Sequence, residues 1–261
     1  MSIKTAVLNG VATIEIARPE KKNALTQPMY TAMADALDAA ADDPAVRAVL
    51  FTGQPGIFTS GNDIEDFAAR GRSGGEGQGS GVIDSPVGRF LLTLARFPKP
   101  VVVAVTGAAI GIGTTMLLHS DLVYVSDEAR LAMPFVSLGL VPEFASSLLV
   151  PQLMGGRRAA EKLLLGEPIT PEQAVEFGLA NAVIPAAEVV NHARRMAERF
   201  NALPPGAVRE AKRLMRAPQR ELVEQTIQAE GRIFGERLKT PEAMEAFMAF
   251  LQKRKPDFSK F

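Results

Sequence analysis

The sequence predicts an α/β protein in which a largely parallel sheet precedes a helical C-terminal region. Val101 to Val105 is an unbroken apolar and mostly β-branched run, typical of a strand buried on both faces of a parallel sheet. Strand-like runs alternate with helical segments, which favours right-handed parallel crossovers. From about Ala186 onward, the apolar residues mainly follow helical spacing. A change in composition at residues 203–205 marks the expected boundary between core and tail.

The composition indicates a soluble protein without redox or metal chemistry based on cysteine. The chain has 261 residues, of which 47% are hydrophobic, so it can bury a large core. The 29 basic and 29 acidic residues balance, so no overall charge attracts nucleic acid or a membrane surface. Cys is absent and only two His are present, which makes a zinc site implausible. No signal peptide or apolar run of roughly 20 residues is seen, and a cytoplasmic location is expected.

The N-terminal third predicts a hairpin, a helix and a strand. Residues 5–8 and 12–17 alternate as strands do and are joined by Asn9-Gly10, a strong hairpin signal. Thr26 and Pro28 begin a helix with apolar residues at helical spacing. Residues 46–51 form a compact apolar strand, and the segment 57–64 turns sharply at glycine.

The central part contains a glycine-rich loop and further strands. Residues 71–81 are so rich in Gly and Ser that a surface loop is expected, with a mobile lid as the alternative. A helix at 86–96 follows. After the strand at 101–105, a glycine-spaced turn at 107–113 leads into a helix at 114–119. The next strand, 122–125, is expected to continue to 130–133.

The last third is mostly helical. A helix is expected at 157–165, and Thr170 to Gln173 is a capping box that begins a short helix ending at Gly178. A last strand covers 182–184. Three or four amphipathic helices then follow: one has Val189, Ala193, Met196 and Phe200 on one face, and the final one begins at Thr240-Pro241.

The segment MPFVSLGLVPEFASS, residues 133–147, contains the strongest candidate for a catalytic carboxylate, Glu143. Because Pro142 and Glu143 stand between apolar runs, the pair is predicted to form the first turn of a helix. Pro loses no hydrogen bond there, and a negative charge meets the positive helix end. A glutamate at the start of a helix is more often only a cap residue. The neighbouring motifs must therefore decide between a catalytic and a capping role for Glu143.

Two glycine turns supply candidate oxyanion donors. The spacing of Gly107, Gly111 and Gly113 fits neither a dinucleotide-binding motif nor a phosphate-binding P-loop. The turns Gly61-Asn62 and Gly111-Ile112 can each present a free backbone N–H, the second at a helix N-terminus. Two convergent donors make an oxyanion hole.

With these motifs, the sequence resembles the crotonase, or enoyl-CoA hydratase/isomerase, superfamily nearly end to end. The resemblance lies in RPEKKNAL at 18–25, FTSGNDI at 58–64, VTGAAIGIG at 105–113, SDLVYVSDEARLAMPFVSLGLVPE at 120–143 and FLQKRKPDF at 250–258. It implies a spiral of ββα turns over residues 1–200 with the coenzyme A thioester site, and a helical trimerisation region over 201–261. A homotrimer, or a hexamer built as a dimer of trimers, is then expected.

The resemblance also implies roles for individual residues. The amides of Asn62 and Ile112 become the oxyanion donors and Glu143 the catalytic base. Substrate and coenzyme A contacts are expected from residues in the same motifs: Lys22, Ala24, Ser60, Gly61, Asp63, Ile64, Gly111, Phe135 and Lys255. Coenzyme A is part of the substrate, so no separate cofactor or metal is implied.

Departures from the family pattern favour isomerisation over hydration. Typical hydratases of the family carry two glutamates where this chain has Thr115 and Phe135, and hydration needs two groups to activate water and deliver a proton. The pattern that ends at Glu143 resembles the peroxisomal-type Δ3,Δ2-enoyl-CoA isomerases, which keep one glutamate. The chain ends Phe258-Ser259-Lys260-Phe261, without the peroxisomal signal of eukaryotic members.

Glu143 is then expected to move a proton while an apolar pocket, including Phe135, Phe144 and Leu138, keeps its pKa near neutral. Another crotonase reaction, such as weak hydration or decarboxylation, remains the alternative. A coenzyme A thioester-binding protein without turnover is the alternative outside enzymes, and RNA binding is disfavoured by the zero net charge.

Several other polar residues are expected to be structural. These are His119 and His192 in helical patterns, Asp121 and Asp127 beside a strand, and Ser146 and Ser147, which lack a neighbouring His. Asp63 has a purely structural alternative. Lys253 to Lys255 is either a solvated helix end or a contact to the coenzyme A phosphates of a neighbouring subunit.

Overall fold

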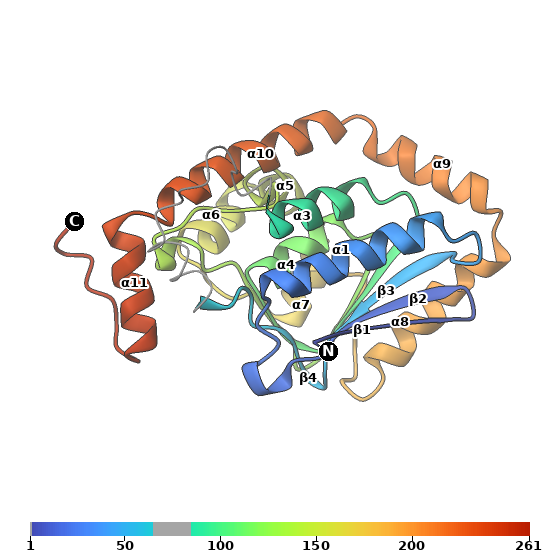
Figure 1. Cartoon of the computed structure of the whole chain (residues 1–261), viewed down its shortest axis with the longest axis horizontal. Coiled ribbons are helices and arrows are strands. Elements are labelled where there is room, and N and C mark those ends of the chain that lie inside the picture. The colour runs from blue at the N-terminus through green and yellow to red at the C-terminus, as the bar shows by residue number, and fades with distance from the viewer. Residues whose placement is uncertain (1, 65–84) are drawn as a thin grey trace.

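A computed structural model describes residues 2–64 and 85–261, and its largest element is a six-stranded sheet (Figure 1). Its strand order is β1-β2-β3-β5-β7-β9, with β1 antiparallel to β2 and every other pair parallel. The strands are β1 (Ile3–Leu8), β2 (Val11–Ile16), β3 (Ala48–Thr52), β5 (Val101–Val105), β7 (Leu122–Ser126) and β9 (Ala182–Ile184). The predicted hairpin and parallel sheet are therefore confirmed.

A second, three-stranded parallel sheet has the order β4-β6-β8 and was not predicted as such. It consists of β4 (Gly56–Thr59), β6 (Gly107–Ile110) and β8 (Arg130–Ala132). Residues 107–110 were expected to be a turn, and 122–133 one strand. Instead, β7 and β8 lie in different sheets. Strands this short and rich in Gly and Ala carry little intrinsic β signal and depend on their neighbours.

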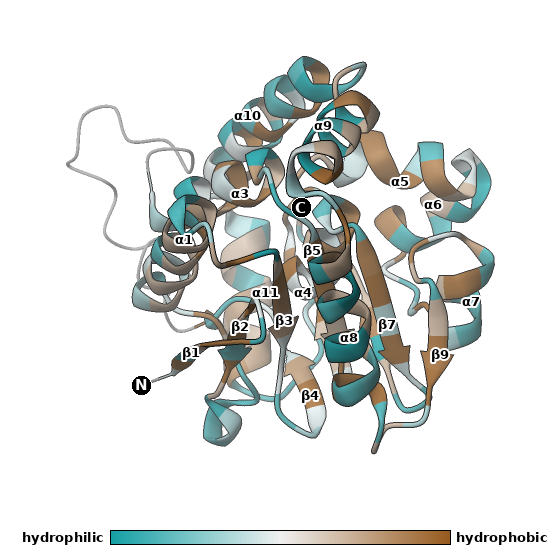
Figure 2. Ribbon diagram, turned by 90° about the vertical axis from the view of Figure 1, so that its right-hand side faces the viewer, coloured by the Kyte–Doolittle hydropathy of each residue, from teal (hydrophilic) through white to brown (hydrophobic). Residues whose placement is uncertain are grey.

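The six-stranded sheet is covered on both faces, as the Val101–Val105 run predicted (Figure 2). On one face, Val101, Val103 and Val105 belong to the main core. This core also contains the buried faces of α1 (Gln27–Asp42) and α3 (Pro86–Arg96). On the other face, Val102 and Ala104 pack in a smaller cluster with Val189, Ala193 and Ala197 of α8 (Val189–Glu198). Both faces of β5 are therefore shielded from solvent, which explains its unbroken apolar sequence.

The remaining helices are α4 (Ile112–Thr115), α5 (Ser146–Met154), α6 (Gly156–Leu164), α7 (Pro171–Glu176), α9 (Pro205–Arg216), α10 (Arg220–Arg237) and α11 (Pro241–Leu251). Among them, α6 and α7 lie close to the predicted positions, whereas α4 and α5 begin elsewhere than predicted. The capping box is formed, since Thr170 accepts the amide of Gln173 while the Gln173 side chain accepts that of Thr170.

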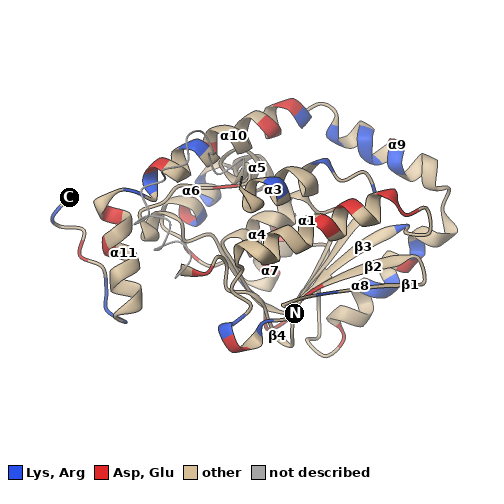
Figure 3. Cartoon of the chain, in the orientation of Figure 1, with Lys and Arg blue, Asp and Glu red and all other residues tan. Residues whose placement is uncertain are grey.

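The C-terminal helices form an arm over one side of the molecule. Figure 1 shows α9 and α10 running along its upper edge and α11 at one end. Basic side chains follow one another along α9, but acidic side chains are interspersed over the other elements (Figure 3). Among residues 2–64 and 85–261, no helix has the length and apolar character needed to cross a membrane.

Candidate functional site

The three candidate catalytic segments each follow a strand of the small parallel sheet. Asn62 comes after β4, Ile112 after β6 and Glu143 after β8. Because the strands are parallel, the chain leaves all three at the same edge. A Cβ placed on Gly61 would lie 3.0 Å from the carbonyl oxygen of Ile110, and the amide of Gly111 donates to the carbonyl of Ala132 at 2.8 Å. The small sheet therefore brings together segments distant in sequence.

The backbone around Asn62 leaves its amide N–H on the side facing away from Leu25. Leu25 forms a parallel bridge with Asn62, in which Leu25 donates to the Gly61 carbonyl at 2.8 Å and accepts from the Asp63 amide at 2.9 Å. In a parallel ladder, bonds from the two flanking residues leave the central amide pointing to the opposite side. Tyr30 donates its hydroxyl to Asn62 Oδ1 at 2.5 Å and fixes the side chain.

Ile112 is the first residue of α4, so its amide belongs to the first turn and has no acceptor within the helix. The turn before it needs glycine, because Gly111 has φ +58°. The predicted helix at 114–119 consists instead of α4 and a 3₁₀ helix at Met116–His119. A helix of four residues has little macrodipole, so any anion stabilisation here must come from the peptide N–H itself.

Glu143 does not lie in the first turn of a helix, and this prediction was wrong. The chain first makes a left-handed turn, with φ +60° at Phe144 and +57° at Ala145, and α5 begins only at Ser146. Two successive left-handed residues with side chains are uncommon and strained, above all when one is aromatic. The Glu143 side chain is therefore placed by a strained turn rather than by helical geometry.

The surroundings of Glu143 favour its protonated form. The residue is only 6% exposed, and burial raises the pKa of its carboxyl group to about 8, with a further contribution from the negative charge of Glu230. Its Oε1 has no hydrogen-bond partner among the described residues. A buried carboxyl group with a pKa near neutrality and a free oxygen is suited to accept and return a proton.

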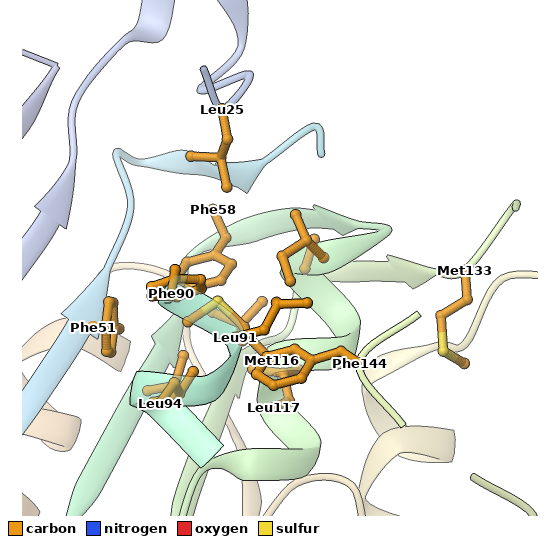
Figure 4. Packing of buried hydrophobic residues seen from close by; sticks show 14 of the residues in the cluster. Leu25, Phe51, Phe58, Phe90, Leu91, Leu94, Met116, Leu117, Met133 and Phe144 are labelled. Carbon is orange, nitrogen blue, oxygen red and sulfur yellow. The ribbon is translucent and has the colours of Figure 1, made fainter. Parts of the chain in front are cut away.

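Phe144, which follows Glu143, and Phe135 both belong to the hydrophobic core. The Phe144 ring lies close to Met116 and Leu117 (Figure 4) and stacks on His119. Phe135 packs edge-on against Phe234 of α10, with ring centroids 6.5 Å apart. Its ring edge would also meet a Cβ on Gly111 at 3.7 Å. These contacts bring Phe135 beside the second glycine turn.

The residues expected at the coenzyme A end also come together. Ser60 donates its amide to the carbonyl of Lys22 at 3.1 Å. Asp63 accepts from Arg18 at 2.7 Å, and this ion pair gives Asp63 a structural role. Arg18 also donates to the carbonyl of Ala24 at 2.9 Å. Thus residues 22–24 and 60–64 form one joined surface.

Asn23, which was not singled out from the sequence, holds this surface together. It is fully buried and has φ +54°. Its amide group donates to the carbonyls of Ile16 and Phe58, each at 3.0 Å, and its Oδ1 accepts the amide of Arg18 at 2.7 Å. The sequence offered one signal for this role, an Asn in a loop, because Asn enters the left-handed region more readily than most residues.

Other candidate residues lie apart or have structural partners. Lys255 is exposed and belongs to the tail that follows α11. Figure 1 shows this tail beside α11 and away from β4. Asp121 accepts the amide of Val101 and pairs with Lys212, and Asp127 accepts the amide of Ala186. These contacts make both residues structural, but they join segments distant in sequence and do not cap a local turn. Within the described residues, no cluster of three His, Asp or Glu side chains could hold a metal ion. The glycine-rich loop at 71–81 lies outside the described residues.

Comparisons with known proteins agree with this arrangement. Residues 7–260 match the family model described as enoyl-CoA hydratase/isomerase. The chain is 36% identical to enoyl-CoA delta isomerase 2 of Rattus norvegicus over 94% of its own length, and it spans 62% of that relative. It is 30% identical to a probable enoyl-CoA hydratase of Bacillus subtilis, covering 98% of both chains.

Solved structures give the same result for the fold. The structure of Pseudomonas aeruginosa OdaA shares 52% identity with a TM-score of 0.90, over 96% of this chain and 98% of that one. An enoyl-CoA hydratase/isomerase from Pseudoalteromonas atlantica shares 40% identity with a TM-score of 0.91, over 99% and 100%. The chain therefore has the crotonase fold and is a member of the enoyl-CoA hydratase/isomerase family.

Proposed function

We propose that this enzyme moves the double bond of a 3-enoyl-CoA to position 2, with Glu143 as its single acid–base group. The observation that carries the proposal is the buried Glu143 carboxyl, whose pKa is raised to about 8 and whose Oε1 has no partner among the described residues. A carboxyl group of this pKa is half ionised at about pH 8 and about one tenth ionised at pH 7, so it can both take and return a proton.

The proposed reaction needs no net gain or loss of atoms. Ionised Glu143 removes a proton from carbon 2, next to the thioester carbonyl. The electron pair of that C–H bond forms the double bond of a dienolate, whose negative charge rests on the thioester oxygen. The amides of Asn62 and Ile112 donate hydrogen bonds to this oxygen. Protonated Glu143 then delivers its proton to carbon 4, which leaves the double bond between carbons 2 and 3.

The residues at the two positions where typical hydratases of the family carry glutamate support isomerisation over hydration. Thr115 is fully buried, and its Oγ1 lies 3.5 Å from the Ile112 carbonyl oxygen. Phe135 is buried against Phe234. Neither side chain can ionise to activate water. The 36% identity to a named delta isomerase supports the same choice, while the named hydratases among the relatives keep hydration as the alternative.

The substrate and assembly are also part of the proposal. Residues 22–24 and 60–64 form the surface for the adenine end of coenzyme A, and Gly61, Gly111 and Phe135 line the thioester end. In a trimer or a hexamer, Lys255 contacts the coenzyme A phosphates of a neighbouring subunit. Residues 1–200 form the core with the thioester site, and 201–261 form the oligomerisation region of a cytoplasmic enzyme.

The test follows formation of the conjugated 2-enoyl thioester by absorbance. Wild type should convert 3-enoyl-CoA. Glu143→Gln should be slower by about 10²- to 10⁴-fold, the range typical of acid–base groups. Glu128→Gln, a change at an exposed glutamate, is the control and should retain full activity. Hydration of 2-enoyl-CoA that survives in Glu143→Gln, without isomerisation in wild type, would overturn the proposal.

A further inference from the structure

We propose that Glu230 is a positioning residue that holds the catalytic turn and sets the properties of Glu143. This inference rests on the proposed function, because it assigns to Glu143 the role of base. Glu230 lies on α10. It forms hydrogen bonds with residues of the catalytic turn that are more than 80 positions away in the sequence. It is only 7% exposed, although Glu is rarely buried without hydrogen-bond partners.

The Glu230 carboxylate accepts two backbone amides from the segment that follows Glu143. Its Oε2 accepts the amide of Ala145 at 2.6 Å, and its Oε1 accepts the amide of Ser147 at 2.9 Å. Both amides belong to the start of α5, where no backbone acceptor within the helix is available. Glu230 therefore acts as a capping group supplied by a distant helix.

The turn that Glu230 caps needs support from its surroundings. Phe144 and Ala145 are both left-handed, which disfavours this conformation in an isolated chain. Such backbone persists only where neighbouring groups hold it. Two groups do so here. His119 bonds the Phe144 carbonyl at 2.7 Å, and Glu230 bonds the Ala145 amide on the following residue.

One face of α10 follows the whole segment from Phe135 to Ser147. Glu230, Phe234 and Arg237 stand at helical spacing on this face. Phe234 packs on Phe135, and Arg237 donates its Nε–H to the carbonyl of Gly139 at 2.9 Å. The segment that carries Glu143 is thus fixed along its length by one helix, and Glu230 is the contact nearest to Glu143 in sequence.

The charge of Glu230 adds a second effect. Burial raises the pKa of the Glu230 carboxyl, while hydrogen bonds from Ser147 and the Ala145 amide favour its ionised form. Its negative charge adds to burial in raising the pKa of Glu143. Among the described residues, the other titratable side chain bonded to this turn is His119, and burial lowers its pKa to about 3, which keeps it neutral. Glu230 is therefore the charged group that makes Glu143 a stronger base.

Glu230→Gln is the sharpest variant, because it keeps the size of the side chain. The Ala145 and Ser147 amides bind different oxygens of Glu230, so in Gln one of them would meet an NH2 donor in place of an acceptor. The Gln side chain also carries no charge. Glu236→Gln is the matched control on the same helix, since Glu236 is exposed and pairs across one turn with Arg232.

Three readouts separate positioning from a general loss of stability. In Glu230→Gln, we expect kcat for 3-enoyl-CoA to fall about 10-fold or more, while KM changes less than about 2-fold. The acidic limb of the pH profile should move to lower pH, because the repulsion on Glu143 is gone. Carbon NMR of the Glu143 carboxyl should report the same downward shift without substrate. The Glu236 variant should match wild type in all three.

An unchanged kcat together with an unchanged pKa of Glu143 in folded Glu230→Gln would overturn the inference. If this variant unfolds, Ala145→Gly supplies a background in which the turn is less strained, and the same comparison is made there. Absence of isomerase activity in wild type would contradict the proposed function instead. The NMR titration would still decide whether Glu230 controls Glu143.

Discussion

The imidazole of His119 lies flat on the phenyl ring of Phe144. The ring centroids are 3.8 Å apart and the planes differ by 13°. The Nε2 atom of His119 lies 2.7 Å from the Phe144 carbonyl oxygen, and the neutral ring donates its proton there. His119 therefore contacts both the side chain and the backbone of the residue that follows Glu143.

His119→Leu should lower the free energy of unfolding at pH 7 by about 1–3 kcal/mol, because the Phe144 carbonyl loses its buried partner. Urea unfolding monitored by circular dichroism measures this change. His192→Leu is the control. His192 is only partly buried and makes an edge contact with Tyr124. Equal losses in the two variants would contradict a special role for His119.

The same histidine makes wild type less stable in acid. Burial lowers the pKa of His119 from 6.5 to about 3, so between these values only the unfolded chain binds the proton. The stabilising contribution of neutral His119 is complete above pH 6.5 and is lost as the pH falls toward 3. The stability difference between wild type and His119→Leu should thus shrink by about 2 kcal/mol from pH 7 to pH 5. A difference that does not change with pH would mean that the ring is charged in the folded protein.

Isomerase activity should rise with pH through about 8. The pKa of Glu143 is raised to about 8 by burial and by Glu230, and only the ionised form is a base. The profile of kcat/KM against pH for 3-enoyl-CoA should rise about tenfold per pH unit below this value and then level off. A limb near pH 4 to 5 would show that Glu143 is solvated in the free enzyme.

Glu143→Gln should be more stable than wild type, although we expect its isomerase activity to be lower by about 10²- to 10⁴-fold. The folded protein binds the Glu143 proton more tightly than the unfolded chain, so this stabilising contribution is complete below pH 4.5 and is lost as the pH rises to about 8. By pH 7 the free energy of unfolding of the wild type has fallen by up to about 3 kcal/mol relative to low pH. The variant with uncharged Gln does not lose this stability. Thermal unfolding at pH 5, 7 and 8.5 should show a Tm advantage that grows with pH. A constant or negative difference would contradict the burial of a charge at this position.

The sequence predicted the large sheet better than the small one, for a physical reason. Val101–Val105 is buried on both faces, and its composition alone is typical of such a strand. Gly107–Ile110 becomes a strand only because it pairs with Gly56–Thr59 and Arg130–Ala132. This pairing depends on tertiary structure and leaves no local pattern.

The candidate base could be selected from the sequence, but its geometry could not. Pro142-Glu143 has the composition of a first helical turn, and nothing local indicates two left-handed residues after it. The turn is held by His119 and by Glu230, and the second of these contacts spans 85 residues. His119 was expected to be structural, and its position in the core agrees with that. Glu230 was not singled out, because an isolated Glu on an amphipathic helix is usually exposed.

Gly61→Ala should damage both stability and activity, because this glycine sets the direction of the Asn62 amide. Gly61 has φ +91°, and an added Cβ would lie 3.0 Å from the Ile110 carbonyl oxygen, which is backbone and cannot easily move. Strain of this kind costs about 1–3 kcal/mol. If the turn shifts to relieve the strain, the oxyanion donor moves away, and kcat should fall up to about 10²-fold, as for loss of one donor.

Gly206→Ala in α9 is the matched control, since nothing lies within 4 Å of the added Cβ. The free energy of unfolding should change by less than about 0.5 kcal/mol in this control. Unfolding curves and kcat for 3-enoyl-CoA, measured on both variants, decide the question. A Gly61→Ala enzyme that is less stable but keeps full kcat would contradict the prediction that activity depends on this glycine.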